Sequence, residues 1–221
     1  MENEMSIRKI GVIAGSPSDA EMGAVYFKGR GLEVECGSVA EDAAGAVEFS
    51  SKDEEYKEEV MNGVIGRLKD EGCEALCIYC NALGAAVDTK KLSEENGIKI
   101  VTPFDAYRVL GHGRRVIANL SAATGALAKF EECVKDVNPE ADIRGIYMLS
   151  MTKPIEEGKD PAEIMAEFGI ADYIAHCEKS GCECIILSCT HFPYLMDEMK
   201  KLTELPVIDP ADTMYELIMA E

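Results

Sequence analysis

Two cysteines stand at the ends of apolar, strand-like segments and are followed by polar residues. Cys80 precedes Asn81, and Cys189 precedes Thr190 and His191. A thiol has an ordinary pKa near ~8.5, and a helix N-terminus or a positive neighbour lowers that pKa toward neutrality. Because each cysteine also precedes a predicted helix, we expect each thiolate to lie beside a positive helix end.

One thiolate and one thiol on opposite faces of a carbon acid can invert a stereocentre. The thiolate removes a proton from one face, and the thiol returns a proton to the other, so each group serves as base in one direction and as acid in the other. This scheme requires neither a metal nor a pyridoxal cofactor. The alternative is that both cysteines are small apolar core residues. The polar residues that follow Cys80 and Cys189 favour the chemical role.

The two cysteine segments resemble each other. Residues 72–81 are GCEALCIYCN and residues 181–190 are GCECIILSCT, an offset of 181 − 72 = 109, with the Gly, the first Cys, the Glu and the last Cys shared. The segments read alike, as a helix end, a glycine, a buried strand and a strand-end cysteine. We therefore predict two similar α/β units related by a pseudo-two-fold axis, with the strand-end cysteines facing each other across the cleft between the units.

Strand-like segments alternate with segments of helical period along the whole chain. The predicted strands cover 10–14, 32–36, 75–79, 99–101, 116–119, 143–149, 184–187 and 206–208. The predicted helices cover 21–28, 54–70, 84–95, 104–110, 125–137, 161–179, 194–202 and 211–219. This alternation is typical of parallel α/β sheets, which bind ligands at the carboxyl ends of their strands. The expected domains are 1–103, onto which 206–221 packs back, and 104–205.

The composition is acidic: 22 Lys and Arg against 41 Asp and Glu give the 221-residue chain a net charge of −19. Nucleic acids and anionic membranes are recognised by clustered positive charge, so neither is an expected partner. No apolar run reaches the roughly 18 residues of a membrane span, and the first ten residues lack the organisation of a signal peptide. We therefore expect a cytoplasmic protein, in which the nine cysteines stay reduced.

Several cysteines lie near enough in sequence to be considered as zinc ligands. The two groups are Cys73, Cys77 and Cys80, and Cys182, Cys184 and Cys189. Structural zinc requires four convergent ligands, and alternation along a strand places Cys73 and Cys77 on one face and Cys80 on the other. We therefore predict no metal site and expect the seven remaining cysteines to be core or near-surface residues.

A glycine-rich turn follows the first predicted strand. Its pattern, Gly11-x-x-x-Gly15-Ser16, could cradle a carboxylate or phosphate with backbone N–H groups. The turn lacks the Lys and the spacing of a nucleotide-binding P-loop. Gly15 and Ser16 are therefore candidate substrate-binding residues, and nucleotide binding is not expected.

The two cysteine motifs resemble those of the cofactor-independent aspartate/glutamate racemase superfamily. Residues 189–195, CTHFPYL, look like the second cysteine motif of glutamate racemases, and Cys80-Asn81 looks like the first. The resemblance implies two α/β domains with the active site between them, no cofactor, and Cys80 and Cys189 as the acid/base pair. It implies substrate contacts by the loops that carry Gly15, Ser16, Asn81, Ala82, Ser121, Thr124, Thr190 and His191. His191 would assist the proton transfer.

The chain departs from glutamate racemases at several of these positions. Ala14 and Gly15 stand where those enzymes carry Asp-Ser, residues 45–49 replace a Pro-Tyr-Gly segment, and Ala82 replaces a Thr. The first loop is closer in character to that of aspartate racemases. The expected activity is therefore racemisation of an acidic amino acid, glutamate or aspartate.

Two alternatives stay open. One is another cysteine-dependent member of the superfamily, such as a maleate isomerase or an aspartate-racemase-like enzyme. The other is a non-catalytic protein that binds a small molecule on the same scaffold. A homodimer is a candidate assembly.

Overall fold

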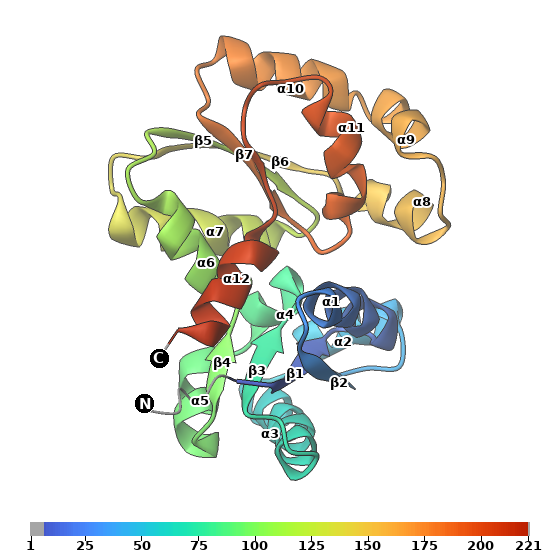
Figure 1. The fold of residues 1–221 in the computed structure, drawn as a ribbon, viewed down its shortest axis with the longest axis vertical. Coiled ribbons are helices and arrows are strands. Elements are labelled where there is room, and N and C mark those ends of the chain that lie inside the picture. Colours follow the sequence, from blue (N-terminus) through green and yellow to red (C-terminus); the bar gives the residue numbers. More distant parts are fainter. Residues whose placement is uncertain (1–6, 221) are drawn as a thin grey trace. The chain divides into compact units, whose positions relative to one another are not determined.

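The computed structural model describes residues 7–220, which divide into two compact units. Unit 1 contains the described residues up to Ala106 and again from Ala211, and unit 2 runs from Tyr107 to Pro210. Each unit is built on a four-stranded parallel sheet with helices on both faces (Figure 1). The prediction of an α/β protein with two similar parallel sheets is confirmed.

Unit 1 contains the strands β1 (Lys9–Ala14), β2 (Glu33–Ser38), β3 (Ala75–Ile78) and β4 (Lys99–Val101), in the order β2-β1-β3-β4. Its helices are α1 (Pro17–Gly29), α2 (Ala43–Ser50), α3 (Glu54–Asp70), α4 (Asn81–Ala86), α5 (Thr89–Asn96) and most of α12 (Pro210–Met219). The sheet separates two apolar clusters. One contains Phe27 of α1 and Met214 of α12, and the other contains Met61 of α3 and Leu92 of α5.

Unit 2 contains the strands β5 (Val116–Ser121), β6 (Asp142–Tyr147), β7 (Cys184–Ser188) and β8 (Val207–Ile208), in the order β6-β5-β7-β8. Its helical elements are α7 (Thr124–Val137), η1 (Leu149–Met151), α8 (Thr152–Glu156), α9 (Pro161–Glu167), α10 (Ile170–Lys179), η2 (Phe192–Leu195) and α11 (Met196–Lys200). The helix α6 (Pro103–Gly111) begins in unit 1 and ends in unit 2. In Figure 1, α7 lies on one side of this sheet and α10 and α11 lie on the other.

The two sheets have equivalent strand orders, and details of the repeated segment are equivalent as well. β3 and β7 begin at the predicted offset, 184 − 75 = 109. Gly72 and Gly181 both have a positive φ, 85° and 75°, which favours glycine at the turn before each strand. The carboxylate of Glu74 accepts the backbone N–H of Lys9 at 3.1 Å, and that of Glu183 accepts the N–H of Arg115 at 2.6 Å. Each glutamate thus joins the start of its strand to the start of the neighbouring first strand.

Three predicted helices are interrupted. The segment 84–95 forms α4 and α5, because Val87 is extended and Asp88 caps α5 by accepting the N–H of Lys91 at 3.0 Å. The segment 161–179 breaks at Gly169, whose φ is 65°. The segment 194–202 forms η2 and α11. Among the described residues, no helix is both long and apolar enough to cross a membrane.

The predicted faces of the unit 1 cysteines are partly wrong. Cys77 packs in the cluster that contains Phe27, and Cys80 packs against the cluster of the opposite face, as alternation predicts. Cys73, however, lies in the cluster that Cys80 contacts, and not in the cluster of Cys77. Alternation does not reach Cys73, because β3 begins only at Ala75 and Cys73 belongs to the preceding turn.

Buried thiols make the stability of the fold sensitive to alkaline pH. Burial raises the pKa of Cys73, Cys177 and Cys184 to about 11. In the unfolded chain these thiols ionise near pH ~8.5, so between about pH 9 and pH 11 the unfolded state binds fewer protons and stability falls as pH rises. We expect a fall in Tm of about 3 °C or more from pH 8 to pH 10.5. Thermal unfolding of Cys184→Ala, measured in reductant, should show a smaller fall than the wild type; an equal fall would contradict the assignment.

A buried lysine supports the helix that follows Cys80. Lys57 of α3 donates from its ammonium group to the carbonyl of Ala86, the last residue of α4, at 2.9 Å, and also pairs with Glu54. A cation at a helix C-terminus is stabilising. We expect Lys57→Met to lower the free energy of unfolding by about 1.5–3 kcal/mol, the range for hydrogen bonds to charged groups. Urea unfolding checks this, with the exposed Lys90→Met as control; equal effects of the two substitutions would contradict it.

Candidate functional site

Cys80 is the N-cap residue of α4 and lies two residues after the end of β3. Its extended backbone turns the chain from strand to helix, and its carbonyl accepts the N–H of Gly84 at 2.9 Å. Burial raises the pKa of the Cys80 thiol, while the backbone N–H groups of Leu83, Gly15 and Ala82 favour the thiolate and oppose that rise. The expected lowering of the pKa is therefore wrong, because burial outweighs the helix end.

Asp19 is an acidic neighbour of Cys80 that the sequence analysis did not select. It lies in the first turn of α1, and its carboxylate also raises the pKa of Cys80. Its Oδ2 lies 3.7 Å from the position that a Cβ on Gly15 would occupy. The sequence shows only an acidic residue three positions after Ser16, a pattern typical of a helix start. That pattern does not indicate that the carboxylate lies near Cys80.

The glycine-rich loop lies beside Cys80. A Cβ on Gly15 would lie only 3.0 Å from the Cβ of Ala46, so glycine permits this close approach, and the same position lies 4.0 Å from the sulfur of Cys80, an ordinary contact distance. Ser16 is buried and caps α1, and its hydroxyl accepts the N–H of Asp19 at 3.4 Å. Asn81 is buried at the start of α4.

Cys189 follows β7 and is half-buried. Its sulfur lies 3.7 Å from Nδ1 of His191. The element after this motif is the short 3-10 turn η2, and the α-helix α11 begins only at Met196, so the prediction of a helix end beside Cys189 is wrong. The imidazole of His191 is the neighbour of this thiol instead.

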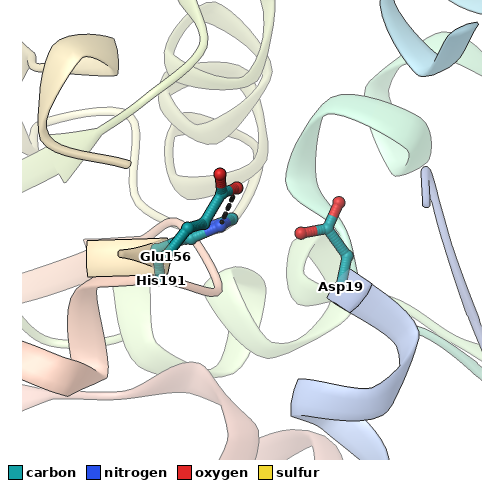
Figure 2. Close-up of side chains that lie close together, drawn as sticks. All are labelled: Asp19, Glu156 and His191. Atoms are coloured by element: carbon teal, nitrogen blue, oxygen red, sulfur yellow. Dashed lines mark hydrogen bonds and ion pairs between the residues drawn. The ribbon is translucent and has the colours of Figure 1, made fainter. Parts of the chain in front are cut away.

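Glu156 holds the other ring nitrogen of His191. Nε2 of His191 lies 2.9 Å from Oε1 of Glu156, as the dashed line in Figure 2 marks. If Nε2 carries the proton and donates to the carboxylate, Nδ1 is an acceptor directed at the Cys189 thiol. Glu156 comes from α8, a helix that the sequence analysis did not predict.

The remaining predicted residues of unit 2 lie at the same end of its sheet. Ser121 ends β5, is buried, and is the register partner of Ser188, the residue before Cys189. The Ser121 hydroxyl lies 3.2 Å from the carbonyl of Ala123. Thr124 is exposed at the start of α7, and Thr190 is half-buried.

The predicted site residues thus form two sets, one at the carboxyl edge of each sheet. The unit 1 set is Gly15, Ser16, Cys80, Asn81 and Ala82, and the unit 2 set is Ser121, Thr124, Cys189, Thr190 and His191. Within unit 1 alone or unit 2 alone, no three His, Cys, Asp or Glu side chains of residues 7–220 bring their ligand atoms together. The cysteines considered as zinc ligands do not converge.

Known proteins with related sequences include glutamate racemases. The glutamate racemase of Clostridium botulinum is 24% identical over 165 residues, which cover 73% of this chain and 63% of that protein. No family model matches the chain.

Solved structures with a related fold include glutamate and aspartate racemases. Glutamate racemase from Francisella tularensis, in complex with D-glutamate, has a TM-score of 0.70 at 17% identity and covers 96% of this chain and 81% of that chain. An aspartate racemase homologue from Pyrococcus horikoshii has a TM-score of 0.71 at 17% identity, with coverage of 97% and 100%.

The sequence comparison points to glutamate racemases, and the fold is shared by glutamate and aspartate racemases. The predicted resemblance to this superfamily is confirmed in sequence and in fold. The chain spans about three fifths of the length of the Clostridium botulinum racemase, 63%.

Proposed function

We propose that the protein is an isomerase that racemises an acidic amino acid, glutamate or aspartate, without a cofactor. The observation that carries the proposal is the equivalence of the two cysteines: Cys80 follows β3, Cys189 follows β7, and these strands have the same place in their sheets. The racemases that resemble the chain in sequence and fold support it.

The proposed reaction is a proton transfer through two thiols. One cysteine, as thiolate, takes the α-proton and becomes a thiol, and the electron pair stays on the α-carbon as a carbanion stabilised by the substrate. The other cysteine, as thiol, gives its proton to the opposite face and becomes a thiolate. By the family resemblance, Cys80 acts on the D-enantiomer and Cys189 on the L-enantiomer.

His191 and Glu156 would prepare Cys189 for this step. A neutral imidazole 3.7 Å from the sulfur can accept the thiol proton, and the carboxylate of Glu156 stabilises the imidazolium that results. The backbone N–H groups at the start of α4 would favour the Cys80 thiolate against the effect of burial. The thiolate of Cys189 would thus be favoured by an imidazole, and that of Cys80 by backbone N–H groups.

The proposed ligand is a small acidic amino acid, and a homodimer stays a candidate assembly. The net charge of −19 repels an anion, so local donors must hold the substrate carboxylates. The N–H groups at the start of α1 and the hydroxyls of Ser121, Thr124 and Thr190 are the donors we assign to this task. Thiol chemistry also requires a reducing compartment, for which we propose the cytoplasm.

Circular dichroism of glutamate and aspartate enantiomers tests the proposal. We expect each optical signal to decay to zero in reductant, with the same rate after chelation and without pyridoxal phosphate. Activity lost on chelation and restored by zinc would overturn the two-thiol mechanism. No decay with any of the four enantiomers would favour the non-catalytic alternative.

The two acids differ by one methylene, which a pocket discriminates by only about 1–3 kcal/mol. We therefore expect both to be racemised, with a modest preference. The ratio of kcat/KM for aspartate and glutamate measures it. A preference beyond about a thousandfold, outside that range, would contradict a loosely specified pocket.

A further inference from the structure

Two buried polar side chains of unit 2 are hydrogen-bonded between β5 and β7, and one of them belongs to the residue directly before Cys189. Asn119 of β5 is 0% exposed and Ser188 of β7 is 1% exposed. The Asn119 amide donates from Nδ2 to Ser188 Oγ at 2.6 Å, and the hydroxyl lies 2.8 Å from Asn119 Oδ1. Ser188 Oγ also lies 3.4 Å from the carbonyl of Leu120. We name Asn119 and Ser188 the strand clasp.

The strand clasp lies on the face of the sheet that α7 covers. Asn119 is paired in register with Gly145 of β6, and paired residues of neighbouring parallel strands point to the same face. A Cβ on Gly145 would lie 2.4 Å from Cδ1 of Leu127 of α7, so the helix packs closely against this row. The strand clasp is therefore enclosed, and its polar atoms depend on each other for hydrogen bonds.

The strand clasp is satisfied in only one register of β5 and β7. Ser121 is opposite Ser188 in that register, and Leu187 points to the other face, into the cluster of α10 and α11. A slip of one residue would turn Ser188 to that face and leave the Asn119 amide without its partner. The register in turn fixes where β7 ends, and Cys189 is the next residue.

We propose that Asn119 and Ser188 are positioning residues for Cys189, which hold its sulfur at the distance from His191 that makes the thiol ionisable. This inference rests on the proposed function, in which Cys189 must ionise. Neither residue was among the candidates selected from the sequence. Cys80 lies in the other unit and serves as an internal control for any effect on thiol chemistry.

The test is alkylation by iodoacetamide across a range of pH, with the rate at each cysteine resolved by mass spectrometry of peptides. The variants are Asn119→Ala, Ser188→Ala and the hydroxyl-retaining Ser188→Thr. The matched control is Ile186→Val, which removes a methyl group from the register partner of Asn119 without touching a polar atom. Circular dichroism verifies that each variant is folded, and Ser188→Ala, the smallest change, serves if Asn119→Ala does not fold.

We expect the midpoint of Cys189 alkylation to rise by about one pH unit in the two alanine variants, a tenfold smaller thiolate fraction at neutral pH. The Cys80 midpoint should stay unchanged in every variant. Ser188→Thr, which keeps the hydroxyl, should retain the wild-type Cys189 midpoint, and Ile186→Val should leave it unchanged. kcat for racemisation should fall about tenfold with KM nearly constant, because positioning affects the ionised fraction and not substrate binding.

Unchanged Cys189 midpoints in the alanine variants would overturn the inference. Equal shifts at Cys80 and Cys189, or a shift in Ile186→Val as large as in Asn119→Ala, would also overturn it, because general loosening of the fold would then explain the data. Alkylation needs no substrate. A selective Cys189 shift in a protein that racemises nothing would therefore support the positioning role and reject the proposed function. A racemase whose alanine variants keep the normal kcat and the normal Cys189 midpoint would support the proposed function and reject the positioning role.

Discussion

Replacing Cys80 or Cys189 by Ala is expected to stop racemisation in both directions. Each substitution removes the base for one enantiomer and the acid for the other, so inversion loses a required step whichever enantiomer is supplied. The remaining thiolate can still remove and return a proton on its own face. Cys80→Ala should therefore keep, at most, slow exchange of the α-proton of the L-acid, and Cys189→Ala slow exchange of that of the D-acid.

Proton NMR of each enantiomer in deuterated buffer measures this exchange. The matched control is Cys77→Ala, which alters a buried cysteine of β3 in the apolar cluster that Cys80 does not contact and should retain racemisation. Near-normal racemisation by either site variant would reject the pair. Activity lost in one site variant only would identify a one-cysteine enzyme.

Replacing His191 by Asn is expected to lower kcat by about a hundredfold, within the range for loss of a general acid or base. The imidazole lies 3.7 Å from the Cys189 sulfur and can accept its proton, and Asn keeps a polar group without the basicity. Glu156→Gln keeps a hydrogen-bond acceptor for the ring but removes the charge that stabilises the imidazolium. We expect a smaller loss, about tenfold, from this second change.

The measurement is kcat against pH for both enantiomers. The control is Glu157→Gln, which changes an adjacent exposed glutamate that pairs with Lys153 at 3.8 Å. Equal activities of Glu156→Gln and Glu157→Gln would show that the contact between Glu156 and His191 has no part in the reaction. A normal kcat in His191→Asn would remove the imidazole from the mechanism.

The repeated segment predicted the fold well because it is specified locally. Gly72 and Gly181 need a positive φ, and the apolar runs after them have the length of buried parallel strands. The helix at 54–70 has the bounds predicted, since Asp53 caps it by accepting the N–H of Tyr56. Where tertiary contacts or a single capping residue determine a helix boundary, as at Asp88, periodicity predicted one helix and the structure has two.

Only those residues of the candidate site that lie at the ends of strands could be predicted from the sequence. Cys80 and Cys189 stand where their motifs predicted, because the carboxyl end of a strand is readable from the sequence. Glu156 was missed because it lies 35 residues before His191, in a five-residue helix too short to show a period. The pKa of Cys80 was missed because burial depends on the whole unit.

The discontinuity of unit 1 has a consequence for synthesis on the ribosome. Residues 107–210 form unit 2 as one continuous stretch, whereas α12 belongs to unit 1 although it is translated after unit 2. Met214 and Ile218 of α12 complete the cluster that contains Phe27. Unit 2 can therefore reach its native state during elongation, while that face of unit 1 stays uncovered until α12 emerges. The nascent chain exposes apolar surface in its first half for longer than in its second.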